Sequence, residues 1–326
     1  MTRVVLVTGV SNPVAARVAQ ALSAEPGVRR VIGADSAPPP RSEAGPRASG
    51  ESGDGPDGVE YVHVGLHDES LGQIVADSGA EIILHLGLDT ARGPHREDTL
   101  LGTMRVLAAA QRSPRVQRVV VRSSASLDAD DAAEVERDTL GLQRRRPDVS
   151  VAVLRLANLI GPSVDTPLTR YLGARFVPTV LGSDPHVRFV HEDDAAEALV
   201  RMALSDETGH FDVAGADSVP LSDCLRRVGG QRLPVPARGL KVLRSVAKHG
   251  RIDYASASNT RAVSVGRLAT GMDTAPLEKA LDWTPAYSSP QAFETFVGSR
   301  AHSTPARGAG LRPVHVLALA RATLGR

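Results

Sequence analysis

The sequence predicts an α/β protein with a doubly wound parallel sheet and a smaller C-terminal α/β lobe. Short continuous apolar runs alternate with helix-like stretches over the first 160 residues, which is typical of strands buried on both faces of a parallel sheet. The first run ends in Thr8-Gly9 and the second in Ala34-Asp35. With 326 residues and 42% hydrophobic content, the chain can form one large domain core with room for a smaller partner.

Each element follows from a local pattern. The strands are expected at residues 4–7, 30–34, 60–64, 81–86, 117–121 and 151–156. Between the first two, apolar residues from 14 to 22 recur at helical spacing, and Pro13 suits the first turn of a helix. Similar stripes predict helices near 71–75 and 100–108. This βαβα order predicts right-handed crossovers in one parallel sheet.

The pattern changes after Pro162, which suggests a second part of the molecule. We expect a main domain at 1–160, a lobe at 161–300 interleaved with the last sheet strands, and a tail at 301–326 with a short helix. Further helices are expected at 193–204, 221–228, 239–248, 276–281 and 290–297, and a strand at 211–214. Residues 36–58 begin with three prolines and lack apolar anchors, so they are expected to form a mobile surface loop.

Composition excludes several classes of protein. A net charge of +1 gives no bulk attraction to nucleic acid or to a membrane surface. The single cysteine, Cys224, excludes an internal disulfide and fits a reducing compartment. The apolar segment at 314–319 is far shorter than the roughly 20 residues of a membrane-spanning helix, and a strand begins too near Met1 for a secretory leader. We therefore expect a cytoplasmic protein.

The turn after the first strand is a candidate phosphate site. A strand that turns into a helix directs backbone N–H groups and the helix dipole at one point, which favours a pyrophosphate. Only Gly9 remains of a three-glycine pattern, since Asn12 and Ala15 occupy the other two positions. Asn tolerates positive φ better than other non-glycine residues, so we expect Asn12 to stand in for glycine there.

Asp35 strengthens the prediction of a dinucleotide. It ends the second strand about 20 residues beyond Ala15, where a carboxylate accepts hydrogen bonds from an adenosine ribose. Its charge would repel a 2′-phosphate, so NAD(H) is favoured over NADP(H). The alternative is a solvent-exposed acid at a strand end.

The segments in order resemble an extended short-chain dehydrogenase/reductase, specifically the NAD-dependent epimerase/dehydratase family with its UDP-glucose 4-epimerase-like members. The matching segments are residues 4–9, 30–35, 83–87, 119–124, 144–162 and 189–194. The resemblance implies a Rossmann domain at 1–160, NAD as cofactor, and a small-molecule ligand such as a nucleotide sugar bound by the lobe. It implies cofactor contacts from Thr8, Gly9, Ser11, Asn12, Pro13, Val14, Asp35, Leu86, Gly87, Ser123 and Asn158. It implies substrate-side roles for Arg155, Gly161, Pro162, Arg188 and His191.

The chain departs from this family at its catalytic pair. The family's Tyr-x-x-x-Lys places a phenol near the reacting carbon while the lysine lowers its pKa. No tyrosine here has a lysine four positions later, and the first lysine is Lys241. The stretch between Ser124 and Arg144 is short, so we expect the loop and helix that carry the pair to be deleted. Ser124 matches the family's catalytic serine; capping or cofactor contact is the alternative role.

Two functions remain open. The first is an NAD(P)-binding protein of this family in which Tyr/Lys catalysis is lost. The alternative is an active NAD-dependent epimerase, dehydratase or reductase that acts on a nucleotide sugar or related substrate with a non-standard acid/base. The histidine and cysteine spacing follows no zinc pattern, so no metal is expected. The family's dimers suggest a possible homodimer through helices near 97–111 and 130–145.

Overall fold

The computed structural model describes residues 2–40, 58–66, 68–87, 96–125, 129–236 and 271–302. Contacts divide the chain into two compact units. Unit 1 comprises Met1–Leu156, Glu192–Val213 and Met272–Pro285, and unit 2 comprises Ala157–His191, Ala214–Gly271 and Ala286–Arg326. Most of the loop expected at 36–58, the helix expected at 239–248 and nearly all of the expected tail lie outside the described residues.

Unit 1 is built on a seven-stranded sheet in the order β11-β6-β5-β4-β1-β2-β3, with every neighbouring pair parallel. Its strands are β1 (Arg3–Thr8), β2 (Val28–Asp35), β3 (Val59–His63), β4 (Ile82–His85), β5 (Arg118–Ser124), β6 (Ser150–Leu156) and β11 (Gly209–Val213). The predicted fold class is confirmed. The strand order reverses between β1 and β4, and ligands of doubly wound folds bind outside the carboxyl ends of the strands at such a point.

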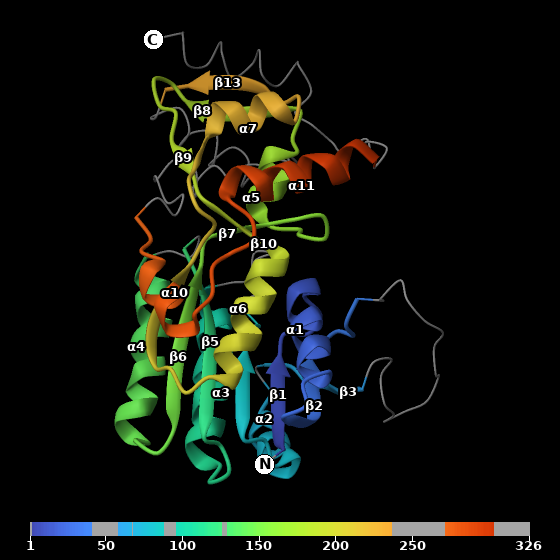
Figure 1. The fold of residues 1–326 in the computed structure, drawn as a ribbon, viewed down its shortest axis with the longest axis vertical. Helices are drawn as coiled ribbons and strands as arrows, with labels where there is room; N and C mark the ends of the chain where they lie inside the picture. Colours follow the sequence, from blue (N-terminus) through green and yellow to red (C-terminus); the bar gives the residue numbers. More distant parts are fainter. Residues whose placement is uncertain are drawn as a thin grey trace. The chain divides into compact units, whose positions relative to one another are not determined.

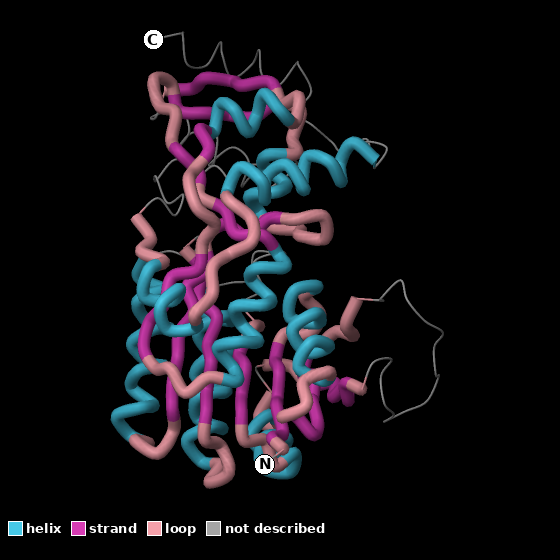
Figure 2. Tube along the Cα trace, in the orientation of Figure 1, coloured by secondary structure: helices cyan, strands magenta, loops and turns pink. Residues whose placement is uncertain are grey.

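Helices cover both faces of this sheet (Figures 1 and 2). On one face, α1 (Pro13–Ser23) packs against α6 (Glu192–Leu204), and α10 (Ala275–Leu281) packs on β11. On the other, α2 (Leu71–Ser78), α3 (Arg96–Arg112) and α4 (Ala129–Arg145) pack side by side. Val119 and Val121 of β5 belong to the core cluster beneath α2, α3 and α4. Because side chains alternate along a strand, residues 118, 120, 122 and 124 face α6.

The helix between β5 and β6 corrects one expectation. We expected the helix between Ser124 and Arg144 to be deleted, but α4 is an α-helix of 17 residues. Val135 and Leu142 of α4 are buried in the core of unit 1, which explains why a helix remains at this place. Tyrosine and lysine are both absent from its sequence.

The described part of unit 2 contains three small two-stranded sheets. They pair β10 (Phe189–His191) with β7 (Asn158–Ile160), β12 (Val219–Pro220) with β9 (His186–Val187), and β13 (Gln231–Val235) with β8 (Phe176–Val180). Its described helices are α5 (Pro167–Leu172), α7 (Leu221–Arg227) and α11 (Ser289–His302). Phe189 stacks on Phe293 with ring centroids 5.6 Å apart, and both are fully buried. This aromatic pair joins β10 to α11 in the core of the unit.

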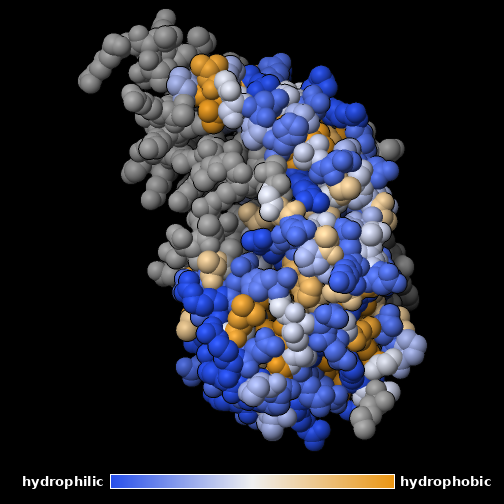
Figure 3. Space-filling model, turned by 60° about the vertical axis from the view of Figure 1, so that its left-hand side comes forward, coloured by the Kyte–Doolittle hydropathy of each residue, from blue (hydrophilic) through white to orange (hydrophobic). Residues whose placement is uncertain are grey.

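The described residues on the face shown in Figure 3 are mainly hydrophilic, with hydrophobic residues in scattered patches. Within the described residues, Leu101 and Met104 of α3 are exposed hydrophobic side chains on one of the two helices expected at a dimer contact. No helix in the described part of the chain is long and apolar enough to cross a bilayer. The homodimer remains a prediction.

Candidate functional site

The turn after β1 has the strand, glycine and helix that the sequence predicts. Gly9 has φ of +83°, and Asn12 donates its backbone N–H to the Gly9 carbonyl before α1 begins. A Cβ on Gly9 would lie 2.5 Å from Cα of Gly87, beyond the end of β4. Both the backbone conformation and this close approach therefore require glycine at position 9.

Asn12 does not replace glycine in the way that we expected. Its φ of −81° lies in the extended region, so the position needs no positive φ. Instead Asn12 caps α1, and its Oδ1 accepts a hydrogen bond from the Val14 N–H at 3.0 Å. Asn is favoured as an N-cap because its side chain satisfies such an N–H. The expectation of a positive φ at Asn12 was wrong.

This cap limits the groups that could bind a phosphate. Helix α1 starts with Pro13, which has no N–H, and the N–H of Val14 is held by Asn12. The N–H of Ala15 has no partner among the described residues. One N–H at the start of α1 thus remains to donate to an anion, where a helix N-terminus offers up to four. The turn fits a pyrophosphate, with fewer donors than an uncapped helix end.

Asp35, the last residue of β2, points at this turn. One carboxylate oxygen accepts the N–H of Ser11 at 2.9 Å, and the other accepts the N–H of Ser36 at 2.7 Å. Asp35 is only 9% exposed, so the alternative of a solvent-exposed acid at a strand end does not describe it. Tyr61 on β3 donates its hydroxyl to the backbone carbonyl of Asp35 at 2.9 Å, and burial is the main cause that raises the pKa of this phenol.

The end of β4 is held by a buried histidine. His85 lies between two hydroxyl groups, with Nδ1 2.8 Å from Thr8 Oγ1 and Nε2 3.1 Å from Thr103 Oγ1. Burial lowers its pKa to about 4, so the ring is neutral near pH 7. Leu86 is buried, and Gly87 packs against Gly9 and Leu66. His85 therefore links the ends of β1 and β4 to α3 and is not available to carry a proton at neutral pH.

The end of β5 places its two serines on opposite faces of the sheet. Ser124 is buried on the face covered by α6. Ser123 faces α4 and donates its hydroxyl to Glu136 at 3.2 Å, while the other oxygen of Glu136 lies 3.6 Å from Nδ1 of His210 on β11. Glu136 and His210 could not be identified from the sequence, because they are 74 positions apart and no local pattern joins them.

The residues expected on the substrate side fall in different units. Arg155 of β6 belongs to unit 1, where it forms a two-pronged ion pair with Asp212 of β11 at 2.7 and 3.0 Å. Arg188 belongs to unit 2, where its carbonyl accepts the amide of Asn158, a residue expected at the cofactor, at 2.9 Å. The Arg188 guanidinium donates to the Gly215 carbonyl. Arg155 thus already has a partner in the sheet of unit 1.

The remaining residues of this set lie near Asn158. Gly161 and Pro162 follow β7 directly, with Gly161 buried and Pro162 exposed. His191 ends β10, where its ring stacks on Tyr287 with centroids 3.9 Å apart and its Nε2 lies 3.1 Å from Thr295 Oγ1. Unit 2 therefore brings Asn158, Arg188 and His191 together on two paired strands.

Tyr171 does not supply the missing phenol. Of the four tyrosines in the sequence, it alone has a basic residue, Arg175, four positions later. Its ring is fully buried in unit 2, and its hydroxyl donates to the Pro178 carbonyl at 2.9 Å. Burial raises its pKa well above the usual value for tyrosine, which opposes a role as a proton donor or acceptor. Tyr254 lies outside the described residues.

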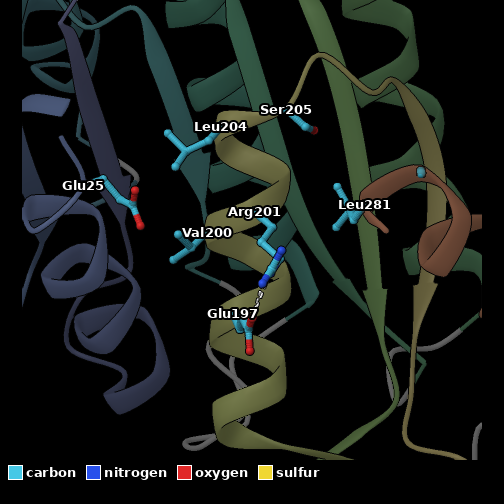
Figure 4. A pocket seen from close by; sticks show the side chains of 8 residues that line it. Glu25, Glu197, Val200, Arg201, Leu204, Ser205 and Leu281 are labelled. Carbon is cyan, nitrogen blue, oxygen red and sulfur yellow. Dashed lines mark hydrogen bonds and ion pairs between the residues drawn. The ribbon is translucent and has the colours of Figure 1, made fainter. Parts of the chain in front are cut away.

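A pocket on unit 1 lies away from these residues. It encloses about 520 Å³ and is lined by parts of α6, α10 and the turn before β2, with Glu197 and Arg201 paired on its wall (Figure 4). Glu25 precedes β2 and Ser205 follows α6, so the pocket lies toward the amino ends of the strands. Within the described residues no group of three histidine, cysteine or acidic side chains could hold a metal ion.

Comparison with known proteins agrees with this architecture. The chain is 28% identical to uncharacterized proteins of Mycobacterium tuberculosis and Mycobacterium bovis, over 96% of its own length and 85% of theirs. A UDP-glucose 4-epimerase of Thermotoga maritima, solved with UDP-glucose, has a TM-score of 0.64 at 15% identity and covers 91% of this chain and 98% of its own. A UDP-glucuronic acid 4-epimerase of Bacillus cereus, solved with UDP-glucuronic acid and NAD, has a TM-score of 0.65 at 13% identity, with coverage of 91% and 98%.

The family of this chain is identified by a match to a family model over more than half of its length. Residues 5–214 match the NAD dependent epimerase/dehydratase family. The chain belongs to that family.

Proposed function

We propose that this protein binds NAD(H) at the turn after β1 and has lost the family's Tyr/Lys catalysis. The observation that carries the proposal is the Asp35 carboxylate, which is buried and tied to the Ser11 N–H in the glycine turn. When bound, NAD would supply a hydride acceptor or donor. Asp35 would bind the adenosine ribose, and the Ala15 N–H with the α1 dipole would bind the pyrophosphate.

The same carboxylate favours NAD over NADP. A 2′-phosphate would bring about two negative charges to a buried acid whose oxygens already accept two backbone N–H groups. Like charges at such a site repel strongly because burial weakens solvent screening. Thr8, Leu86, Gly87 and Ser123 lie at the carboxyl ends of β1, β4 and β5, where a dinucleotide would extend across the strand reversal.

The loss of catalysis is supported by the groups that remain. Hydride transfer needs a proton partner at the carbonyl oxygen, and such general acid–base catalysis is typically worth 10²–10⁴-fold. The α4 helix has no tyrosine or lysine, and His85 stays neutral between two hydroxyls. Ser124 keeps its place at the end of β5, where we assign it to cofactor contact or capping.

Calorimetric titration tests the binding part of the proposal. Purified protein is titrated with NAD(H) and with NADP(H), and we expect saturable binding of NAD(H) with weaker binding of NADP(H). The saturated protein is then incubated with UDP-glucose and UDP-glucuronate while cofactor absorbance and sugar configuration are followed. Failure to bind either dinucleotide overturns the proposal, and turnover of a sugar overturns its catalytic half.

One observation favours the alternative, an active epimerase, dehydratase or reductase with a non-standard acid/base. Ser123, Glu136 and His210 form a chain of polar groups that reaches the carboxyl end of β5. If this chain moves the proton, Glu136→Gln abolishes sugar turnover and leaves NAD affinity unchanged. Turnover that survives in this variant rejects these groups as the acid/base.

A further inference from the structure

Two buried arginines on one face of β5 differ in a way that points to a ligand. Arg118 and Arg122 are four residues apart, so their side chains leave the same face of the strand, beneath α6. Each is 3% exposed, and burial is the main cause that lowers the pKa of each guanidinium to about 10. Both side chains therefore carry a desolvation cost.

Arg118 has hydrogen-bond acceptors that offset the cost of its desolvation. Its guanidinium donates to the Met202 carbonyl at 2.9 Å and to the Glu207 carbonyl at 3.0 Å, both near the end of α6. It also reaches the hydroxyls of Ser150 and Ser205. Carbonyl groups at a helix C-terminus attract a cation because of the helix dipole. Arg118 is a structural residue that ties β5 to α6.

Arg122 has no such partner. Within the described residues it makes no hydrogen bond or ion pair, and its Nε is fully enclosed without an acceptor. Burial alone accounts for its lowered pKa, with no contribution from a nearby charge of either sign. Buried polar groups without a partner are rare in native proteins, and an unpaired buried charge is the most costly kind. An anion from outside the chain would satisfy it.

The strand register places Arg122 at the ligand-binding edge of the sheet. Thr8 of β1 pairs with His85 of β4, which pairs with Val121 of β5. Residue 122 is therefore one step beyond the ends of β1 and β4, level with Gly9 and Leu86. It lies two strands from the glycine turn, roughly 10 Å away at the usual strand spacing. This distance separates Arg122 from a pyrophosphate bound at the turn after β1.

We propose that Arg122 recognises a carboxylate on the ligand, so that the protein selects a nucleotide sugar with an acidic group over its neutral counterpart. This inference rests on the function proposed above. A single guanidinium balances the one charge of a carboxylate and can bind both oxygens in a planar fork. A phosphate monoester carries about −1.5 to −2 at pH 7 and would leave charge uncompensated beside the buried Leu154, the register partner of Arg122 on β6.

Paired titrations test the selectivity. UDP-glucuronate and UDP-glucose differ only in the carboxylate, so each is titrated into the NAD-saturated protein. A charge-assisted hydrogen bond predicts that UDP-glucuronate binds about 10- to 100-fold more tightly. Arg122→Met is expected to abolish this difference and Arg122→Lys to restore part of it. Equal affinity for the two sugars in the wild type, or no binding of either to a protein that binds NAD, overturns the inference.

A ligand-free measurement separates recognition from a structural role. Without a partner, Arg122 contributes no stabilising hydrogen bond or ion pair, and methionine retains the packing of its alkyl stem, so Arg122→Met should unfold at the same temperature as the wild type or higher. Arg118→Met is the matched control and should unfold at a lower temperature. A lower unfolding temperature for Arg122→Met overturns the inference, because it identifies a structural role. If NAD itself fails to bind, the proposed function fails first, and the stability comparison still reports on Arg122.

Discussion

Replacing Asn12 with glycine should strengthen NAD binding, although it removes a capping interaction. In the wild type the Asn12 side chain holds the Val14 N–H, and Pro13 has none to offer. Asn12→Gly frees the Val14 N–H beside that of Ala15, so two donors would face a pyrophosphate at the start of α1. Glycine is also an acceptable N-cap, and it costs only a few tenths of a kcal/mol relative to asparagine.

The gain follows from the value of one added donor. A hydrogen bond to a charged group is worth about 1.5–3 kcal/mol, and each 1.4 kcal/mol is about tenfold in affinity. Since water would otherwise bind the freed N–H, we take the lower value and expect NAD to bind about tenfold more tightly to the variant. The free energy of unfolding should fall by less than about 0.5 kcal/mol.

Calorimetry on matched variants tests this reasoning. Asn12→Ser keeps a capping oxygen and should bind NAD like the wild type. Asn12→Asp keeps the cap and adds a negative charge near the pyrophosphate, so it should bind more weakly. If Asn12→Gly leaves the NAD dissociation constant unchanged while its helix content is intact, the Val14 N–H does not contact the ligand, and our account of the turn is wrong.

Three further predictions follow from the same region. Asp35→Ala should weaken NAD binding and reduce the discrimination against NADP; unchanged titrations of both cofactors would exclude Asp35 as the ribose contact. The pKa of His85 is about 4 in the folded protein and 6.5 in the unfolded chain. The neutral ring therefore contributes fully to the free energy of unfolding above pH 6.5, and this contribution is lost as the pH falls toward 4. The advantage of wild type over His85→Gln in urea unfolding should shrink by about 3 kcal/mol over that range, and an unchanged difference would contradict a buried neutral ring. Gly9→Ala should lower the free energy of unfolding by about 2 kcal/mol or more, because position 9 has a positive φ and a Cβ there would contact Gly87. Gly27→Ala is the control and should lower it much less, since no atom lies near the added Cβ. Equal losses of stability in the two variants would refute the requirement for glycine at position 9.

The fold was predictable because its signals are local and repeat along the chain. Apolar runs gave the buried strands, and turn residues such as Gly9 and Asp35 marked their carboxyl ends. The site was less predictable because its decisive contacts join distant residues. Whether Asn12 caps a helix or adopts positive φ depends on the path of the turn, and both suit asparagine. The Glu136–His210 contact joins α4 to the last strand of the sheet, and no sequence pattern indicates it.

Arg122 shows how a sequence signal can be present and still be overlooked. A charged residue directly after Val119, Val120 and Val121 breaks a strand that is otherwise buried, and charged residues are rarely buried without a partner. From the sequence alone, Arg118 and Arg122 are indistinguishable, since both flank the same apolar run. Only the structure separates them, because it shows that α6 supplies acceptors to one and not to the other.

The α4 helix is held in the fold by residues other than a Tyr-x-x-x-Lys pair, which its sequence does not contain. Val135 and Leu142 bury one side of this helix in the core of unit 1, so removing the helix would expose the face of the sheet that it covers. The residues that stabilise α4 are therefore distinct from those that perform the family's chemistry. Selection for stability retains the residues that stabilise α4 whether or not the catalytic residues are retained. Membership of the family therefore does not establish activity. Activity must be judged from side chains at the ends of β1, β2, β4 and β5, where this chain has Asp35, Ser124 and Arg122, the last without a hydrogen-bond partner among the described residues.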